Sequence, residues 1–398
     1  MKLSDRILRM QPSATALMAA KAREKKRRGL DVISFATGEP DYDSPPEAIA
    51  AAKKAMDEGQ THYPPTNGIA PLREAIAGYY RTHFGLRYDP EKEIVVGTGA
   101  KQLIYEALGA LLNPGDEVIV FSPAWVSYVE QIRLFDGIPV QVDTAASGFI
   151  PDIQAIENAV TAKTTALIIN SPNNPTGIVY PADCLEAIAR LALRKEITII
   201  NDEVYERLVF DQPQSPQITR ICPEAADRVL NVNGVSKAFA MTGWRIGYAL
   251  GPAHLMKGIS DFQGHLTSGT SSISQWAATD ALLKSHEKCE EMKAGFKKRR
   301  DLIVHLLSDI RGIRFIPPQG AFYVFIDITS FLGGATRLRL ESDVAFCEAF
   351  LEHKNVSLVP GTAFLAPGFV RLSYSCTEEE IREGVRRFKN FLNEIRAM

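Results

Sequence analysis

The chain has 398 residues, enough for about two or three domains of ordinary size. Its 45% hydrophobic and 23% charged content is that of a soluble globular protein, and 45 basic against 47 acidic residues argue against a nucleic-acid-binding protein. Five cysteines without a C-x-x-C spacing predict neither a disulfide framework nor a zinc site. The charged N-terminus lacks a long apolar run, so we expect a cytoplasmic protein without a signal peptide or membrane anchor.

Helical signals come first along the chain. The basic run KAREKKRRG at 21–29 has no interleaved aromatic residues, which favours the solvated face of a helix ended by Gly29 over the alternative, a phosphate-binding patch. Two further helices are predicted to open at Pro45-Pro46 and at Pro71, because apolar residues at helical spacing follow each of them.

Short apolar runs, rich in Val and Ile and bounded by Gly, Pro, Asn or Asp, then recur. They are Ile94–Val96, Val118–Phe121, Ala166–Ile169, Ile197–Ile200, Val229–Val232 and Ile246–Leu250. Helix-length periodic segments, such as 100–112 and 181–195, lie between several of them. This alternation predicts an α/β fold with a mainly parallel sheet covered by helices.

The pattern changes after about residue 285, where long charged helical segments flank strand-like pieces at 321–327 and 356–359. This predicts a second, smaller α+β domain. The pattern alone leaves open whether the first 45 residues join it.

Polar residues follow four of the predicted strands, and ligands of open α/β sheets bind at the carboxyl ends of strands. Gly97–Lys101 leads into a helix whose N–H groups can hold a phosphate, although a tight turn also needs such glycines. Asn170–Gly177 contains two prolines and paired asparagines, which predict a rigid turn and also offer hydrogen-bond donors.

The other two strand ends carry charged groups. Asp202 follows one strand, where capping of a helix is the alternative role. Ser236 and Lys237 follow the next, and Arg245 opens a further strand. A lysine behind a buried strand is costly to desolvate unless it is paired or used, although ordinary surface exposure remains the alternative.

These groups favour one kind of chemistry. The sequence shows no metal-ligand cluster, no Ser-His-Asp triad and no nucleotide-binding fingerprint. A nucleophilic lysine and an anionic cofactor remain. Pyridoxal 5'-phosphate fits, because its aldehyde bonds to lysine, its ring nitrogen takes a carboxylate, and its phosphate takes Arg, Ser and backbone N–H groups.

Four segments resemble the signature blocks of fold-type I, class I aminotransferases: GTGAKQ at 97–102, SPNNPTG at 171–177, NDEVYE at 201–206 and SKAFAMTGWRIGY at 236–248. The resemblance spans nearly the whole chain and is greatest to the bacterial aspartate aminotransferases of the subgroup that also contains prephenate aminotransferases. It implies a large cofactor-binding domain at 46–285 and a small domain built from 1–45 and 286–398.

The resemblance implies three catalytic residues. Lys237 would bond to the cofactor aldehyde and then move a proton between substrate and cofactor. Asp202 would stay ionised beside the ring nitrogen, so that the ring accepts electrons. Tyr205, together with Asn174, would hydrogen-bond the phenolic oxygen of the cofactor. Trp125 would stack on its ring, a position where a core tryptophan is the alternative.

For the cofactor phosphate, the resemblance points to the N–H groups of Gly99, Ala100 and Lys101, the hydroxyl of Ser236 and the guanidinium of Arg245. Tyr63 is similar to the family tyrosine that reaches the phosphate of the neighbouring subunit. A homodimer with shared active sites is therefore implied.

For the substrate, the resemblance assigns Arg371 to the α-carboxylate, which a guanidinium binds in a bidentate manner. Gly38 would bring a backbone N–H close to the same group, and Trp125 and Asn174 would also contact the substrate. The distal carboxylate would go to Lys101, with Thr15 nearby; solvent exposure at a helix start is the alternative for Lys101.

The function implied is ping-pong transfer of an amino group between L-aspartate or L-glutamate and 2-oxoglutarate or oxaloacetate, with amino acids and 2-oxo acids as partners and no nucleic acid or membrane. The alternatives are a bifunctional aspartate/prephenate aminotransferase, an aminotransferase of aromatic or neutral amino acids, and a carbon–sulfur lyase. Gln11 precedes Pro12 where many relatives carry a basic residue, which disfavours prephenate. A non-catalytic sensor is disfavoured by the short N-terminal segment and the near-zero net charge.

Overall fold

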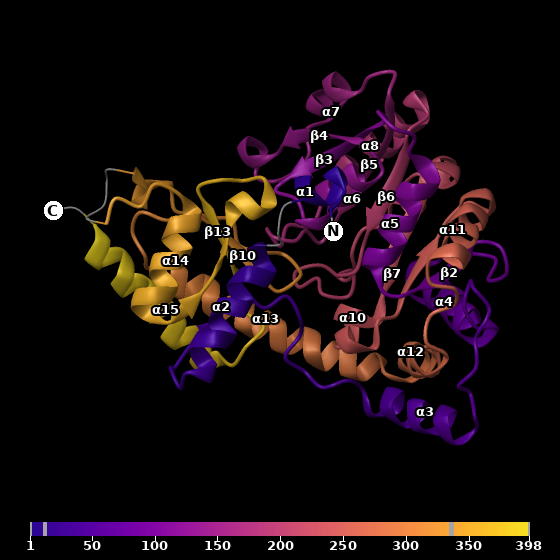
Figure 1. Cartoon of the computed structure of the whole chain (residues 1–398), viewed down its shortest axis with the longest axis horizontal. Helices are drawn as coiled ribbons and strands as arrows, with labels where there is room; N and C mark the ends of the chain where they lie inside the picture. The colour runs from indigo at the N-terminus through magenta and orange to yellow at the C-terminus, as the bar shows by residue number, and fades with distance from the viewer. Residues whose placement is uncertain (1, 11–13, 334–337, 397–398) are drawn as a thin grey trace.

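The structure is a computed structural model that describes residues 2–10, 14–333 and 338–396. Its largest sheet in this part of the chain has seven strands (Figure 1). In spatial order they are β2 (Ile94–Gly97), β8 (Gly247–Leu250), β7 (Val229–Gly234), β6 (Thr198–Asp202), β5 (Thr164–Asn170), β3 (Glu117–Ser122) and β4 (Ile138–Asp143). Only β8 runs antiparallel to its neighbours, so the predicted mainly parallel sheet is confirmed.

The central strands are buried on both faces, which explains their near-continuous apolar sequences. In β5, Leu167 and Ile169 join the core on one face, while Ile168 joins the core on the other. The edge strand β4 has no such run, because only Val142 is buried in it. The sequence pattern therefore missed β4.

Helices cover this sheet, and the sequence predicted four of them. The two predicted to open at prolines are α3 (Pro46–Asp57) and α4 (Ala70–Phe84), and the two periodic segments are α5 (Ala100–Leu111) and α8 (Ala182–Lys195). The remaining ones in this region are α6 (Ser127–Leu134), α7 (Ile153–Ala159), α9 (Ile218–Ile221), α10 (Val235–Ala238), α11 (Ala253–Leu266) and α12 (Ser272–Lys284).

A second group of elements lies beside the large sheet (Figure 1). It holds an antiparallel sheet of β12 (Val359–Pro360), β13 (Phe369–Ser373), β10 (Tyr323–Asp327) and β9 (Arg314–Phe315), and a parallel pair of β1 (Ile33–Ser34) with β11 (Val356–Ser357). Its helices are α2 (Ala14–Arg27), α14 (Asp343–Lys354) and α15 (Glu378–Ile395). The short α1 (Asp5–Arg9) lies instead beside α6 of the large-sheet group, where Arg6 forms an ion pair with Asp136 at 2.9 Å (Figure 1). The predicted α+β character after residue 285 is confirmed.

The long helix α13 (His286–Ser308) runs below both groups (Figure 1). It fixes the segment before α3, because Arg299 forms an ion pair with Asp41 at 2.6 Å. A Cβ at Gly295 would collide with the hydroxyl of Tyr42, so α13 and this segment pack closely. One apolar core runs through both groups, and the boundary at 285/286 stays a prediction.

The basic run at 21–29 forms the end of α2, and Gly29 follows with a φ of 81°. The solvated-face interpretation is wrong for Lys25, which is only 9% exposed. Its amine donates to the carbonyl of Leu351 at 3.3 Å and forms an ion pair with Glu352 at 3.0 Å. Lys25 therefore joins α2 to α14, a contact between distant segments that no local pattern reveals.

All five cysteines are free thiols. In the described part of the chain, no helix is both long enough and apolar enough to cross a membrane.

Candidate active site

A cavity of about 690 Å³ opens where β5, β6 and β7 end, with Asn170, Asp202 and Gly234 in its lining. Residues of α2, and of β10 and β13 in the antiparallel sheet, also line it. The cavity brings together most of the residues predicted for the site: Thr15, Gly38, Ala100, Lys101, Trp125, Asn174, Asp202, Tyr205, Ser236, Lys237, Arg245 and Arg371. Gly99 and Tyr63 do not line it.

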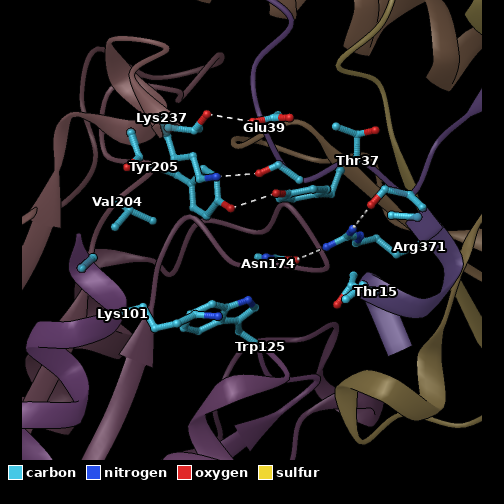
Figure 2. A pocket seen from close by; sticks show the side chains of 18 of the residues that line it. Thr15, Thr37, Glu39, Lys101, Trp125, Asn174, Val204, Tyr205, Lys237 and Arg371 are labelled. Atoms are coloured by element: carbon cyan, nitrogen blue, oxygen red, sulfur yellow. Dashed lines mark hydrogen bonds between the residues drawn. The ribbon is translucent and has the colours of Figure 1, made fainter. Parts of the chain in front are cut away.

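Lys237 is on α10, one turn after β7, and points into the cavity (Figure 2). Its amine donates a hydrogen bond of 2.5 Å to the carbonyl of Gly38. Burial lowers the pKa of Lys237 to about 8, partly opposed by the nearby carboxylate of Glu39. A substantial fraction of this amine is therefore neutral near physiological pH, as a nucleophile requires.

Asp202 ends β6 and is 4% exposed. Tyr128 donates a hydrogen bond of 2.5 Å to its Oδ2, and the N–H of Val204 donates one of 3.4 Å to its Oδ1. Burial raises the pKa of Asp202 to about 6, while these hydrogen bonds and Lys237 oppose the rise. The carboxylate is ionised at neutral pH. It does not cap a helix, because turns follow β6 at this point.

Tyr128 on α6 is a site residue that the sequence reasoning missed. Its side chain is 2% exposed, lines the cavity and packs edge-on against Trp125, with ring centroids 5.2 Å apart. Buried tyrosines usually find a polar partner, and here the partner is Asp202. No local signal distinguishes this tyrosine from one in the apolar core.

Arg371 lies on β13 and is 2% exposed. Its Nη1 donates to Asn174 Oδ1 at 3.0 Å, and its Nη2 donates to the carbonyl of Ala36 at 3.1 Å. The buried Nε has no acceptor, and the guanidinium forms no ion pair with any residue that the structure describes. A buried, uncompensated cation is costly, so this geometry favours the binding of an anion.

The paired asparagines of the 170–177 turn have different tasks. Asn173 Oδ1 accepts from the N–H and the hydroxyl of Thr176, at 3.2 and 2.8 Å, so its side chain holds the turn. Asn170 Oδ1 accepts from the N–H of Asn174 at 2.8 Å. Asn174 is thereby fixed with its amide toward Arg371 and the cavity (Figure 2). Asn173 therefore has the structural role predicted for this turn, and Asn174 is placed for the functional one.

Tyr205 is 3% exposed and lines the cavity. Its hydroxyl lies 2.9 Å from that of Tyr323, the first residue of β10. Tyr323 also lines the cavity and was missed by the sequence reasoning. Burial raises the pKa of Tyr205 well above its ordinary value, so the phenol stays protonated and can donate.

The 97–101 loop forms a cationic corner of the cavity with Arg245. Gly99 has a φ of 84°, and a Cβ there would lie 2.6 Å from Arg245 Nη2, so glycine lets the guanidinium approach. The N–H groups of Ala100 and Lys101, at the start of α5, have no acceptor in the described structure. The N–H of Gly99 donates to the carbonyl of Gly97 at 2.8 Å, so it is already engaged. Two of the three predicted N–H donors are thus available to an anion.

Lys101 and Trp125 lie against each other, with the amine 4.7 Å from the ring centroid (Figure 2). Trp125 lines the cavity and is only partly buried, although it also packs against the apolar core on one face of the large sheet. A Cβ at Gly38 would meet only the hydroxyl of Tyr323, at 3.5 Å, so the protein itself does not demand glycine there. Arg23 and Lys26 of the basic run also line the cavity.

Tyr63 is 96% exposed, and its contact with a second subunit stays a prediction. Gln11 and Pro12 lie outside the described residues.

The cavity fits pyridoxal 5'-phosphate by its own chemistry. It offers a lysine of lowered pKa, an ionised carboxylate, N–H groups without acceptors beside Arg245, and a buried guanidinium whose Nε has no partner. Together with the α/β sheet, these groups define an enzyme that bonds its cofactor through a lysine amine.

The chain belongs to the aminotransferase class I and II family, whose model matches residues 30–388. It is 42% identical over 395 residues to the aspartate/prephenate aminotransferase of Thermus thermophilus, with 98% of each chain covered. It is 40% identical over 398 residues to the aspartate aminotransferase of Geobacillus stearothermophilus, with 100% of each covered. The solved aspartate aminotransferase of Rhizobium meliloti is 38% identical and superimposes with a TM-score of 0.94, over 99% of this chain and 100% of that one. This chain is therefore a transaminase, and its family implies pyridoxal phosphate as the cofactor.

We expect the rate at which the apoprotein bonds pyridoxal 5'-phosphate to rise with pH through about 8, because the neutral amine of Lys237 is the reactive form. An ordinary lysine would give a rise through about pH 10.4. Rapid mixing with the cofactor, followed by visible absorbance, measures this rate. A rise centred near the ordinary lysine value would contradict the lowered pKa, and Lys237→Ala, which forms no imine band, is the control.

We expect Tyr128→Phe to move the acid limb of the kcat profile to higher pH. This limb follows the loss of the Asp202 charge, whose pKa burial raises and the hydrogen bond from Tyr128 lowers. Removing the donor to Oδ2 takes away a hydrogen bond to a charged group, worth about 1.5–3 kcal/mol, and so raises the pKa of Asp202 by about one unit or more. Tyr88→Phe removes a hydroxyl bonded to Asn231, outside the cavity lining, and is the matched control. An acid limb at the same pH in both variants would show that Tyr128 does not tune Asp202.

Proposed function

We propose that this transaminase acts on dicarboxylates as an aspartate aminotransferase, exchanging amino groups between L-aspartate or L-glutamate and 2-oxoglutarate or oxaloacetate. The observation that carries the proposal is the pair of cations in one cavity, Arg371 and Lys101, neither of which is ion-paired within the described chain. A substrate with two carboxylates satisfies both charges. The names of the similar proteins from Thermus thermophilus and Geobacillus stearothermophilus support the same substrates.

When bound, pyridoxal 5'-phosphate supplies an aldehyde that bonds to amines and a ring that accepts electrons from the substrate Cα. Lys237 Nζ would hold the cofactor through its aldehyde and, once free, would accept the proton that leaves the substrate Cα. Asp202 would keep a proton on the ring nitrogen, because Tyr128 stabilises the carboxylate charge. The N–H groups of Ala100 and Lys101, with Ser236 and Arg245, would bind the phosphate.

On the substrate side, Arg371 takes the α-carboxylate and is oriented by Asn174. Lys101 takes the distal carboxylate, and Thr15 lines the same cavity. An enzyme for neutral or aromatic amino acids has no use for a second cation at Lys101. Prephenate as a further acceptor remains the alternative, because the relative from Thermus thermophilus carries that activity in its name.

We also propose a homodimer in which Tyr63 reaches the neighbouring cavity, with residues 46–285 as the large domain and 1–45 plus 286–398 as the small one. A tyrosine that is 96% exposed and outside its own cavity supports an intersubunit role. The β1–β11 pair joins residues 33–34 to residues 356–357 of the C-terminal part. A cytoplasmic location agrees with five free thiols.

We expect Lys101→Ala to lower kcat/KM for aspartate by about 10- to 150-fold, the value of a hydrogen bond to a charged group. Turnover of alanine, which has no distal carboxylate, should change far less. Arg371→Ala should lower kcat/KM for both substrates by about 30-fold or more. If Lys101→Ala left aspartate turnover unchanged while Arg371→Ala abolished it, the dicarboxylate assignment would be wrong.

The shared site is tested by co-expressing Lys237→Ala and Tyr63→Ala subunits. Each variant alone carries a defect in both sites of its dimer. In the mixed dimer both defects fall in one site, so the other is native, and activity above that of either parent is expected. No recovery in a purified mixed dimer, or a monomer by analytical ultracentrifugation, would contradict the role of Tyr63.

A further inference from the structure

Tyr323 lies in the wall of the cavity, in contact with both Arg371 and Tyr205. Its side chain is 1% exposed, yet it lines the cavity. In the antiparallel pair of β10 with β13, Tyr323 lies opposite Ser373, and Phe325 lies opposite Arg371. Tyr323 and Arg371 are therefore diagonal neighbours on the same face of the sheet, within reach of each other.

The two ends of the Tyr323 side chain touch different groups. The face of its ring lies 4.4 Å from the guanidinium carbon of Arg371, and Phe364 covers the guanidinium from 5.1 Å. Its hydroxyl lies 2.9 Å from the hydroxyl of Tyr205. One side chain thus contacts the group assigned to the substrate carboxylate and the group assigned to the cofactor oxygen.

The hydrogen bond between the two hydroxyls has a direction, because a single proton lies between them. If Tyr205 donates to a cofactor oxygen, then its own oxygen is left to accept from Tyr323. Donors in such chains strengthen one another. The positive charge of Arg371 near the ring makes the Tyr323 hydroxyl a better donor, and a carboxylate bound to Arg371 weakens that influence.

We propose that Tyr323 is a positioning residue that links the two sites: an anion bound at Arg371 changes the hydrogen bond that Tyr205 offers to the cofactor, and Tyr323 transmits that change. The proposal rests on the proposed function for the roles of Arg371 and Tyr205. A second link runs through Asn174, which accepts from Arg371 at 3.0 Å. Removal of the Tyr323 hydroxyl therefore reduces the coupling without abolishing it.

The two contacts can be separated by substitution. Tyr323→Phe keeps the ring against Arg371 and loses the hydroxyl, whereas Tyr323→Leu loses both. Tyr374→Phe is the matched control, since Tyr374 is also buried and its hydroxyl donates to the carbonyl of Ala321 at 3.3 Å, outside the cavity lining. Thermal unfolding checks that each variant is folded, and Tyr323→Phe alone suffices if Tyr323→Leu does not fold.

The first readout is the visible spectrum of the holoenzyme, titrated with pH without and with succinate, a dicarboxylate that lacks an amino group. In Tyr323→Phe we expect the spectroscopic pKa of the succinate-free enzyme to rise by about half a unit to one unit, the value of one neutral hydrogen bond. The further shift caused by succinate should be smaller than in the native enzyme. Tyr374→Phe should match the native enzyme in both respects.

The second readout is the Kd of succinate. Tyr323→Phe should leave it within about twofold, because the aromatic face is retained, and Tyr323→Leu should raise it by about 2- to 30-fold through loss of the cation–π contact. A succinate-induced shift in Tyr323→Phe equal to the native one overturns the link alone. A native holoenzyme whose band does not respond to succinate overturns the roles of Arg371 and Tyr205, and the link with them.

Discussion

The burial of the Arg371 guanidinium is the constraint on which the rest of the site depends. A cation that is 2% exposed, with no ion-pair partner in the described chain, is tolerated only if its surroundings hold it in one orientation. Asn174 and the carbonyl of Ala36 do so by hydrogen bonds, and Tyr323 and Phe364 do so by their rings. Asn174 follows β5 of the large sheet and the other three belong to the second group of elements, so the site exists only where the two groups meet.

Burial shifts the pKa values of Asp202 and Lys237 in opposite directions. It raises the pKa of Asp202 to about 6 and lowers that of Lys237 to about 8. Above about pH 6 the carboxylate is charged, and as the pH approaches about 8 the neutral amine becomes abundant. The same loss of water thus brings an acid and a base into their working forms in one range of pH. Hydrogen bonds from Tyr128 and from the N–H of Val204 keep the pKa of Asp202 from rising further.

The sequence predicted the central strands and the residues at their ends because both follow from local patterns: buried parallel strands read as apolar runs, and polar groups after them are conspicuous. Tyr128 and Tyr323 were missed because an aromatic residue in an apolar segment looks the same whether it faces a core or a cavity. The burial of Lys25 depends on α14, more than three hundred residues away in the chain. The engagement of the Gly99 N–H, and the division of tasks between Asn173 and Asn174, depend on backbone geometry that residue types do not encode.

The close packing of Gly295 against Tyr42 gives α13 an influence on a cavity that this glycine does not line. Tyr42 lies four residues after Gly38, whose carbonyl accepts from Lys237, and Asp41 is tied to the same helix by Arg299. A side chain at 295 would have to displace the Tyr42 hydroxyl, and with it a ring that packs against Phe296 and Arg299. A position on the outer helix is therefore restricted by a residue that is close in the chain to the partner of Lys237.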